Sequence, residues 1–170
     1  MNMITNKEAA FLIKKFDLIK HPEGGYYREV YRSRAIITQE GLPKRFNGDR
    51  VFCTTIYFLL ESADFSAFHQ IKSDEIWHFY AGSPLTIYEI DSQGLLKTTI
   101  LGNTNTSCFQ HIIPAQTWFA AEVIDKNSYA LVGCTVAPGF EFIDFELGKR
   151  NYLLQNFPQH IDSISRFTQK

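Results

Sequence analysis

Apolar positions along the chain predict one helix followed by a long series of strands. Near the N-terminus, apolar residues recur at helical intervals, at Ala9, Leu12, Ile13 and Phe16. Thr5 and Glu8 have the spacing of a capping box, which favours a helix start at this point. Pro22 disfavours a helical backbone at His21, so we expect the helix to end by His21.

Beyond Gly25 the pattern changes to short apolar, β-branched or aromatic segments separated by turn residues. We expect strands over 26–32, 51–60, 65–71, 75–80, 85–90, 95–101, 108–113, 118–124, 129–136 and 140–145, and a short helix over 149–155. Many short strands without alternating helices are typical of an all-β sandwich or barrel, of which a jelly roll is the favoured variant. The sequence predicts a single domain over 1–170, with a helical segment over 1–20, a barrel over 21–146 and a C-terminal segment over 147–170.

The charge and the aromatic content of the chain indicate which kinds of partner to expect. There are 17 basic and 18 acidic residues, for a net charge of -1, which gives no general field for nucleic acid or an anionic membrane. We therefore expect neither a nucleic-acid nor a membrane partner. Aromatic residues make up 15% of the chain, more than one small barrel needs for its core. With the sheet edges that such a fold leaves to cover, this predicts a homodimer.

Cysteine usage and the N-terminal sequence favour a reducing compartment. The chain has 3 cysteines, which cannot all pair with one another, and none lies in a CxxC arrangement. The first ten residues include Lys7 and Glu8 and lack the apolar core of a signal peptide. We therefore expect a cytoplasmic protein.

His69 and Glu75 are the candidate catalytic residues. Side chains alternate along strands, so His69 and Ile71 share one face of their strand, and Glu75 and Trp77 share one face of the next. If the two strands form a hairpin, His69 and Glu75 point into the same cavity. A histidine beside a carboxylate in an aromatic pocket is suited to proton transfer near neutral pH. The same pair could instead supply part of the coordination shell of a divalent metal ion.

The neighbouring aromatic residues are candidate ligand contacts. Trp77 is expected to wall the pocket, although ordinary core packing explains it equally well. By alternation, His78 and Tyr80 lie on the face opposite Glu75, so an interface or structural role is as plausible for them as a role in the site. A tyrosine, Tyr80 or Tyr26, could serve as the acid opposite His69.

Two further segments hold polar candidates at the rim. The bend at 21–25 does not itself require Glu23 or Arg28, and a carboxylate with a guanidinium could orient a polar or anionic ligand. Gln116 is expected near the barrel mouth, where its amide could hydrogen-bond a ligand or simply face solvent. The candidate ligand-binding residues are therefore Glu23, Tyr26, Arg28, Trp77, His78, Tyr80 and Gln116.

The segment from His69 to Gly82 resembles the first motif of the cupin superfamily. That motif reads His-x-His, three or four residues, Glu, six residues, Gly, and this chain matches its spacing with Ile71 in place of the second histidine. In cupins these residues usually supply metal ligands. The resemblance therefore places His69 and Glu75 at ligand positions and removes a ligand at Ile71.

A second segment resembles the other cupin motif, Pro-x-Gly-x-x-His. Here the proline is Pro114, Gln116 replaces the glycine, and Phe119 replaces the histidine. Two of the four usual metal ligands are thus replaced by apolar side chains. No cofactor is expected, and a divalent metal at His69 and Glu75 stays a minor alternative.

Three blocks together resemble the Cupin_5 type, a branch known mainly as a domain of unknown function. They are HPEGGYYRE at 21–29, SDEIWHFYAG at 73–82 and APGF at 137–140, and the resemblance extends from about 13 to 154. It implies a jelly-roll barrel, usually a homodimer, with a pocket similar to that of the sugar-nucleotide 3,5-epimerases. Those relatives use a histidine base without a metal. The resemblance implies no established reaction.

Two functions from different classes fit these observations. One is a metal-independent epimerase or isomerase that acts on a small, carbohydrate-like polar metabolite, with His69 as the base and Glu75 fixing its tautomer. The other is a non-catalytic module that binds or senses such a metabolite. A metal-dependent cupin enzyme is a minor third alternative.

Overall fold

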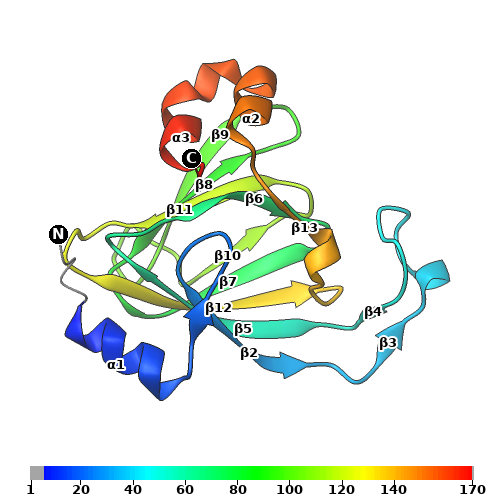
Figure 1. Cartoon of the computed structure of the whole chain (residues 1–170), viewed down its shortest axis with the longest axis horizontal. Helices are drawn as coiled ribbons and strands as arrows, with labels where there is room; N and C mark the ends of the chain where they lie inside the picture. The colour runs from blue at the N-terminus through cyan, green and yellow to red at the C-terminus, as the bar shows by residue number, and fades with distance from the viewer. Residues whose placement is uncertain (1–5, 170) are drawn as a thin grey trace.

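Two β-sheets face each other across the main core of the protein (Figure 1). The computed structural model describes residues 6–169. The larger sheet runs in the order β1 (Ile19–Lys20), β2 (Tyr26–Arg32), β5 (Thr54–Glu61), β12 (Tyr129–Ala137), β7 (Asp74–Gly82) and β10 (Gln110–Ile113). The smaller sheet runs in the order β13 (Phe145–Leu147), β6 (Ser66–Ile71), β11 (Trp118–Val123), β8 (Leu85–Ile90) and β9 (Leu96–Leu101). Neighbouring strands in both sheets are antiparallel.

The core between the sheets is built from alternate side chains of both. Phe58 on β5 and Trp77 on β7 meet Phe119 on β11, and all three are buried. Alternation along each strand sends one set of side chains into this core and the other set outward. The all-β prediction is therefore confirmed, with the two sheets arranged as a sandwich.

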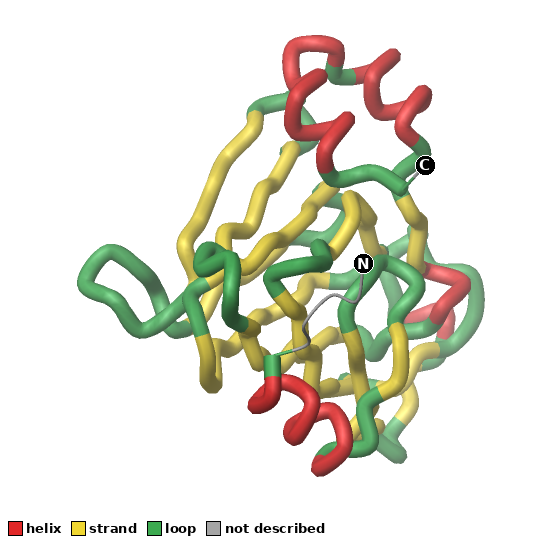
Figure 2. The backbone as a smooth tube through the Cα atoms, turned by 60° about the vertical axis from the view of Figure 1, so that its left-hand side comes forward, coloured by secondary structure: helices red, strands yellow, loops and turns green. Residues whose placement is uncertain are grey.

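Helices cover the outer faces of both sheets, at opposite ends of the molecule in Figure 2. The helix α1 (Lys7–Lys15) packs on the larger sheet, and α2 (Arg150–Asn156) and α3 (Ile161–Arg166) pack on the smaller one. The N-cap of α1 is Asn6, whose side-chain oxygen accepts from the backbone N–H groups of Glu8 and Ala9. The predicted cap, Thr5, lies outside the described residues. At the C-terminus the structure adds α3 to the one predicted helix.

Short 3-10 turns connect several of these elements: η1 (Gln39–Gly41), η2 (Phe142–Asp144) and η3 (Pro158–His160). Across residues 6–169, the helices are too short and too polar to cross a membrane.

The link between β6 and β7 differs from the predicted hairpin. β6 pairs with β13 and β11 in the smaller sheet, whereas β7 pairs with β12 and β10 in the larger sheet. The tight turn at 72–73 thus carries the chain from one sheet to the other, and β6 and β7 do not pair with each other as a hairpin. As a result, His69 and Glu75 come from facing sheets, and both point into the space between them.

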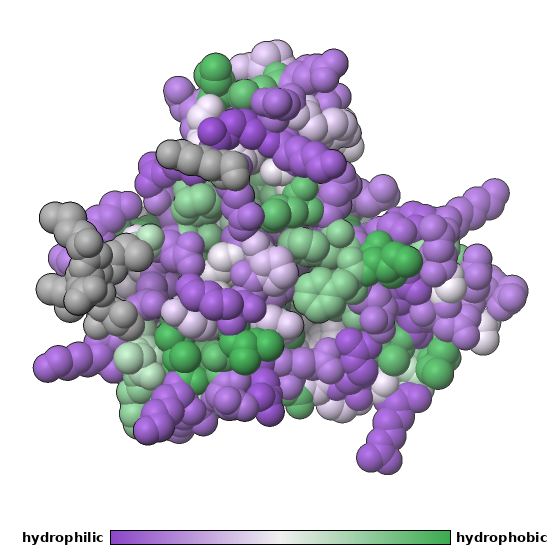
Figure 3. Space-filling view, viewed as in Figure 1, coloured by the Kyte–Doolittle hydropathy of each residue, from purple (hydrophilic) through white to green (hydrophobic). Residues whose placement is uncertain are grey.

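The expected strand over 140–145 is also wrong. Residues Phe142–Asp144 form η2, and only Phe145 at the end of the expected range begins a strand. Asp144 is buried because it pairs with Arg50, and this pairing overrides the local apolar alternation. The apolar residues Phe142 and Ile143 of this turn are exposed, and Figure 3 shows apolar patches among the polar surface of this face.

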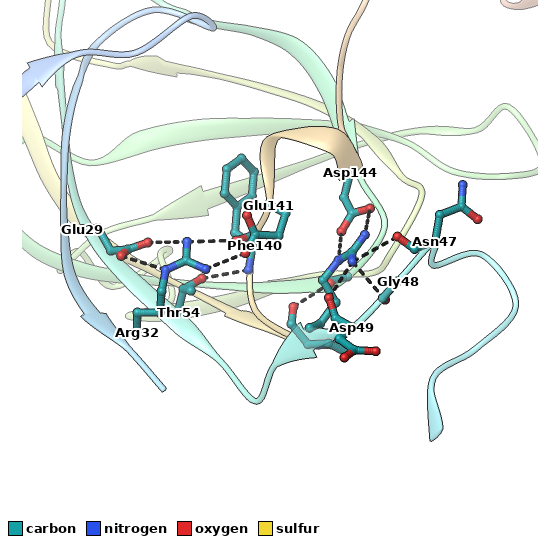
Figure 4. A network of polar contacts seen from close by, with 12 residues as sticks. Glu29, Arg32, Asn47, Gly48, Asp49, Thr54, Phe140, Glu141 and Asp144 are labelled. Atoms are coloured by element: carbon teal, nitrogen blue, oxygen red, sulfur yellow. Dashed lines mark hydrogen bonds and ion pairs between the residues drawn. The ribbon is translucent and has the colours of Figure 1, made fainter. Parts of the chain in front are cut away.

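An arm of the chain between β2 and β5 extends from the sandwich and pairs only β3 (Ile36–Ile37) with β4 (Arg50–Val51) (Figure 1). A buried ion pair ties the base of this arm to η2 (Figure 4). Arg50 donates from Nε and Nη2 to the two carboxylate oxygens of Asp144, at 2.6 and 2.7 Å. Lys72 Nζ lies 3.4 Å from the same carboxylate. The bidentate pair fixes the position of the turn that precedes β13.

Candidate functional site

A small cavity opens between the two sheets beside η2. It offers about 50 Å³ to the centres of water-sized molecules, enough for only a few non-hydrogen atoms. Most of its wall is aromatic or aliphatic. Its polar lining comes from both sheets and from the bend before β2: His21, Glu23, Thr54, His69, Glu75 and Cys134.

The bend before β2 places Glu23 against β6. Gly24 has a φ of 115°, and a Cβ at this position would lie 2.1 Å from the carbonyl oxygen of Phe65. Only glycine fits a backbone that is both left-handed and this close to a neighbour. The Glu23 carbonyl accepts a hydrogen bond from the backbone N–H of Ala67, at 2.8 Å. Together these contacts hold the Glu23 side chain beside His69.

Glu23 is the carboxylate that contacts His69. His69 Nε2 lies 3.1 Å from Glu23 Oε2, and His69 Nδ1 lies 2.8 Å from the carbonyl oxygen of Ala67. The other oxygen of Glu23 accepts from Ser66 Oγ at 2.9 Å, and His21 Nδ1 lies 3.3 Å from Glu23 Oε2. Glu23 is thus a buried junction of two histidines and a serine.

The protonation of this junction follows from its contacts. Burial lowers the pKa of His69. The negative charge of Glu23 and the hydrogen bond to the Ala67 carbonyl oxygen act in the opposite direction, because both favour the protonated ring. Burial alone would raise the pKa of Glu23, but His69 and His21 hold it below its usual range. When protonated, His69 donates from both ring nitrogens, to the Ala67 carbonyl oxygen and to Glu23, and in the neutral ring the two nitrogens still face these same protein atoms. No ring nitrogen of His69 is free to face a ligand.

Glu75 has a different environment on the facing wall. Its side chain is buried, and burial together with the negative charge of Glu23 raises its pKa to about 8. Trp77 and Cys134 lie near enough to oppose this rise, but they do not offset it. Glu75 is therefore a neutral carboxylic acid at pH 7.

The indole N–H of Trp77 is unsatisfied. Nε1 is buried and, within residues 6–169, has no hydrogen-bond partner, although it lies near the Glu75 carboxyl group. Buried polar groups are nearly always paired in native proteins, so an unpaired donor beside a cavity indicates a place for an acceptor.

Four of the candidate residues meet at this cavity: Glu23, His69, Glu75 and Trp77. The role expected for Glu75 is changed, because Glu23 and Ala67 orient the His69 ring and Glu75 makes no hydrogen bond to it in the described chain. The remaining candidates lie elsewhere: Tyr26, Arg28, His78, Tyr80 and Gln116.

Two of these lie on the outer side of β2. Tyr26 packs in the cluster under α1, and Lys20 Nζ lies 3.9 Å from the centre of its ring. Arg28 pairs with Asp17 at the surface. The neighbour Tyr27 takes the inward position and lines the cavity, because alternation reverses the face at each residue.

The other three also point away from the cavity. His78 contacts Gln110 and Thr135 on the outer face of the larger sheet, and Tyr80 is 52% exposed on the same face. Gln116, with a φ of 64°, lines a separate depression beside η2. The alternation argument had already placed His78 and Tyr80 opposite Glu75.

Sequence reasoning missed His21 and Cys134, which also line the cavity. In the sequence, residues 21–25 were interpreted as a bend before the first strand, and His21 was not assigned a role in the site. Its position two residues before Glu23 was the available signal. Cys134 lies on β12 opposite Trp77 of β7, a pairing that no local pattern reveals.

The lining does not fit the metal site of the superfamily. Ile71 and Phe119 occupy two of the usual histidine positions, and the Phe119 ring centre lies 4.0 Å from that of His69. Over the part of the chain that the structure describes, no three His, Cys, Asp or Glu side chains are grouped to hold a metal ion. The donor set therefore gives no basis for a metal-dependent step.

Comparisons with known proteins agree with the geometry. The model of the Cupin_5 family, described as cupin superfamily (DUF985), matches residues 10–148. A protein from Shewanella oneidensis is 36% identical over 98% of this chain and 99% of its own, with a TM-score of 0.84. A hypothetical protein from Leishmania major is 32% identical over 95% of this chain and 99% of its own, with a TM-score of 0.85.

More distant likeness shows the fold alone. Oxalate decarboxylase from Bacillus subtilis is 14% identical over 89% of this chain and 37% of its own, with a TM-score of 0.54. No curated protein matches the sequence. The family match over most of the chain and the two relatives above 30% identity lead to one conclusion. The chain belongs to the Cupin_5 family of the cupin superfamily.

Proposed function

We propose that this protein binds a small, polar, carbohydrate-like metabolite, of which a group of only a few non-hydrogen atoms enters the cavity, and transfers a proton on it without a metal ion, as an epimerase or isomerase does. The observation that carries this proposal is the buried position of the Glu75 carboxyl group in the cavity wall, where burial and the charge of Glu23 raise its pKa to about 8. A group with a pKa near the working pH can both donate and accept a proton during one reaction.

The proposal assigns the proton-transfer role to Glu75 in place of His69. Both ring nitrogens of His69 already face protein acceptors, so His69 acts through Glu23 as a positioning residue. The charge of Glu23 is one of the two causes of the raised pKa of Glu75. The His69–Glu23 pair therefore tunes Glu75 across the cavity.

A non-catalytic binding module is the second candidate, and one observation favours it. His69, the histidine at the cupin motif position, has no free ring nitrogen, so the usual histidine base of the metal-free relatives is not available. In that case the same cavity would hold the metabolite without changing it.

Isotope exchange separates the two functions. A metabolite library is screened by thermal shift, and each ligand found is incubated with the protein in heavy water and followed by NMR. Proton transfer predicts that a carbon-bound hydrogen of the ligand exchanges with solvent, with chelator present or absent, and that Glu75→Gln stops the exchange. Binding without exchange by the wild type would establish the binding module instead.

A further inference from the structure

The unpaired indole N–H of Trp77 and the carboxyl group of Glu75 lie side by side on one strand of the cavity wall. Glu75 and Trp77 are two residues apart on β7, so their side chains share the face that lines the cavity. The Trp77 side chain is 1% exposed and that of Glu75 is 8% exposed. Across residues 6–169 the Trp77 N–H has no hydrogen-bond partner, and Trp77 and Cys134 lie beside the Glu75 carboxyl group.

Both of these groups are donors in the protein near neutral pH. The indole N–H can only donate, and a protonated carboxyl group donates through its O–H. Two neighbouring donors on one wall of a cavity match one acceptor oxygen with two lone pairs, such as a carbonyl oxygen. An ammonium ligand would bring only further donors and would leave the Trp77 N–H unpaired.

The charges around the cavity argue against an anionic ligand. Its described lining contains Glu23 and Glu75 but no lysine or arginine. The nearby cations Arg50 and Lys72 are both held by Asp144. A carboxylate or phosphate placed in this space would lose its water without gaining a cationic partner.

We propose that the cavity binds an uncharged compound by its carbonyl oxygen, which accepts hydrogen bonds from Trp77 Nε1 and from the carboxyl group of Glu75. The ligands are therefore aldehydes, ketones or amides with a small group next to the carbonyl carbon, since the cavity has room for only a few non-hydrogen atoms. This inference rests on the proposed function in that it names the ligand class of the same site.

The test is a set of small probes of equal size: acetone and acetamide as neutral carbonyl compounds, acetate as the anion, and isopropylammonium as the cation. The protein has 2 tryptophans, so ¹⁵N-labelling gives two indole N–H signals, and Trp77→Phe assigns them. We expect acetone and acetamide to shift the Trp77 signal on titration at a pH near 6.5, with millimolar dissociation constants, and acetate and isopropylammonium to leave it in place.

Variants distinguish the two donors. Trp77→Phe keeps the ring but removes the N–H and should weaken carbonyl binding by about five- to tenfold. Glu75→Gln keeps a donor and should bind acetamide nearly as well as the wild type, whereas Glu75→Leu should bind it far more weakly. Trp118→Phe is the matched control, because Trp118 packs under α2 and α3 away from the cavity, and it should not alter binding.

Three results would overturn the inference. They are isopropylammonium or acetate binding more tightly than acetamide, unchanged carbonyl binding in Trp77→Phe, and no shift of the Trp77 signal at the highest soluble probe concentrations. These readouts need no turnover. Carbonyl binding without isotope exchange would therefore reject the proposed proton transfer alone, and isotope exchange without carbonyl selectivity would reject the inference alone.

Discussion

The buried acid Glu75 predicts that the stability of the protein depends on pH in a specific direction. Its pKa rises from the ordinary value of 4.5 to about 8 in the folded state. Between these values the folded protein holds a proton on Glu75 that the unfolded chain has lost. The free energy of unfolding must therefore fall as the pH rises through this range, because the folded state binds more protons than the unfolded state.

The magnitude follows from the shift in pKa. Each pH unit within the range changes the free energy of unfolding by about 1.4 kcal/mol, so the full cost at pH 8 is about 5 kcal/mol as an upper limit. Glu75→Gln removes the titrating group and keeps the shape of the side chain. We expect the variant to gain stability over the wild type progressively as the pH rises from about 5 to 8.

Urea unfolding curves measured across this pH range for both proteins check the prediction. The exposed Glu146→Gln serves as the control, because its carboxylate lies on the surface of β13 and its substitution should give no such slope. If the stability difference between Glu75→Gln and the wild type stays constant with pH, Glu75 is ionised in the folded protein. The proton-transfer role proposed for it would then fail as well.

Two further predictions concern the rest of the molecule. Asp144→Asn should lower the free energy of unfolding by roughly 3–5 kcal/mol, because it leaves the buried Arg50 without its counter-charge. Arg50→Met should lower it less, because Lys72 still lies beside the Asp144 carboxylate. The double variant should lose less than the sum of the two losses; denaturant curves for all three in a double-mutant cycle measure this, and additive losses would show that the pair is not coupled. Light scattering should give the mass of a homodimer, since Tyr31, Ile36 and Phe52 are large apolar side chains exposed on and around the arm, and a monomer at micromolar concentration would contradict this.

The sequence predicted most strands well because the signal for a strand is local. Alternation over 75–80 placed Glu75 and Trp77 on one face and His78 on the other, and the structure has this arrangement. Alternation says which residues share a face, but it does not say which sheet a strand joins. The predicted hairpin between β6 and β7 was therefore wrong, although both side chains still reached the cavity.

The error at 140–145 has a different physical cause. Apolar residues alternate there in a way that favours a strand, but Asp144 must turn inward to meet Arg50, which is 94 residues earlier in the chain. A buried ion pair between residues so far apart in the sequence overrides the local strand propensity, and no local sequence pattern indicates that Asp144 pairs with Arg50.

The partner of His69 was hidden for the same reason, and this bears directly on function. Glu75, six residues from His69, was the natural partner by proximity, whereas Glu23 is 46 residues away and reaches His69 only through the glycine bend before β2. Since Glu23 engages the imidazole, Glu75 is left opposite a negative charge with no cation of its own, which favours its neutral form. With Ile71 and Phe119 at two ligand positions, the residues that hold a metal in other cupins are here divided between a buried pair and a free acid. A single rearrangement of partners thus accounts both for the poor fit to a metal and for the presence of an acid suited to proton transfer.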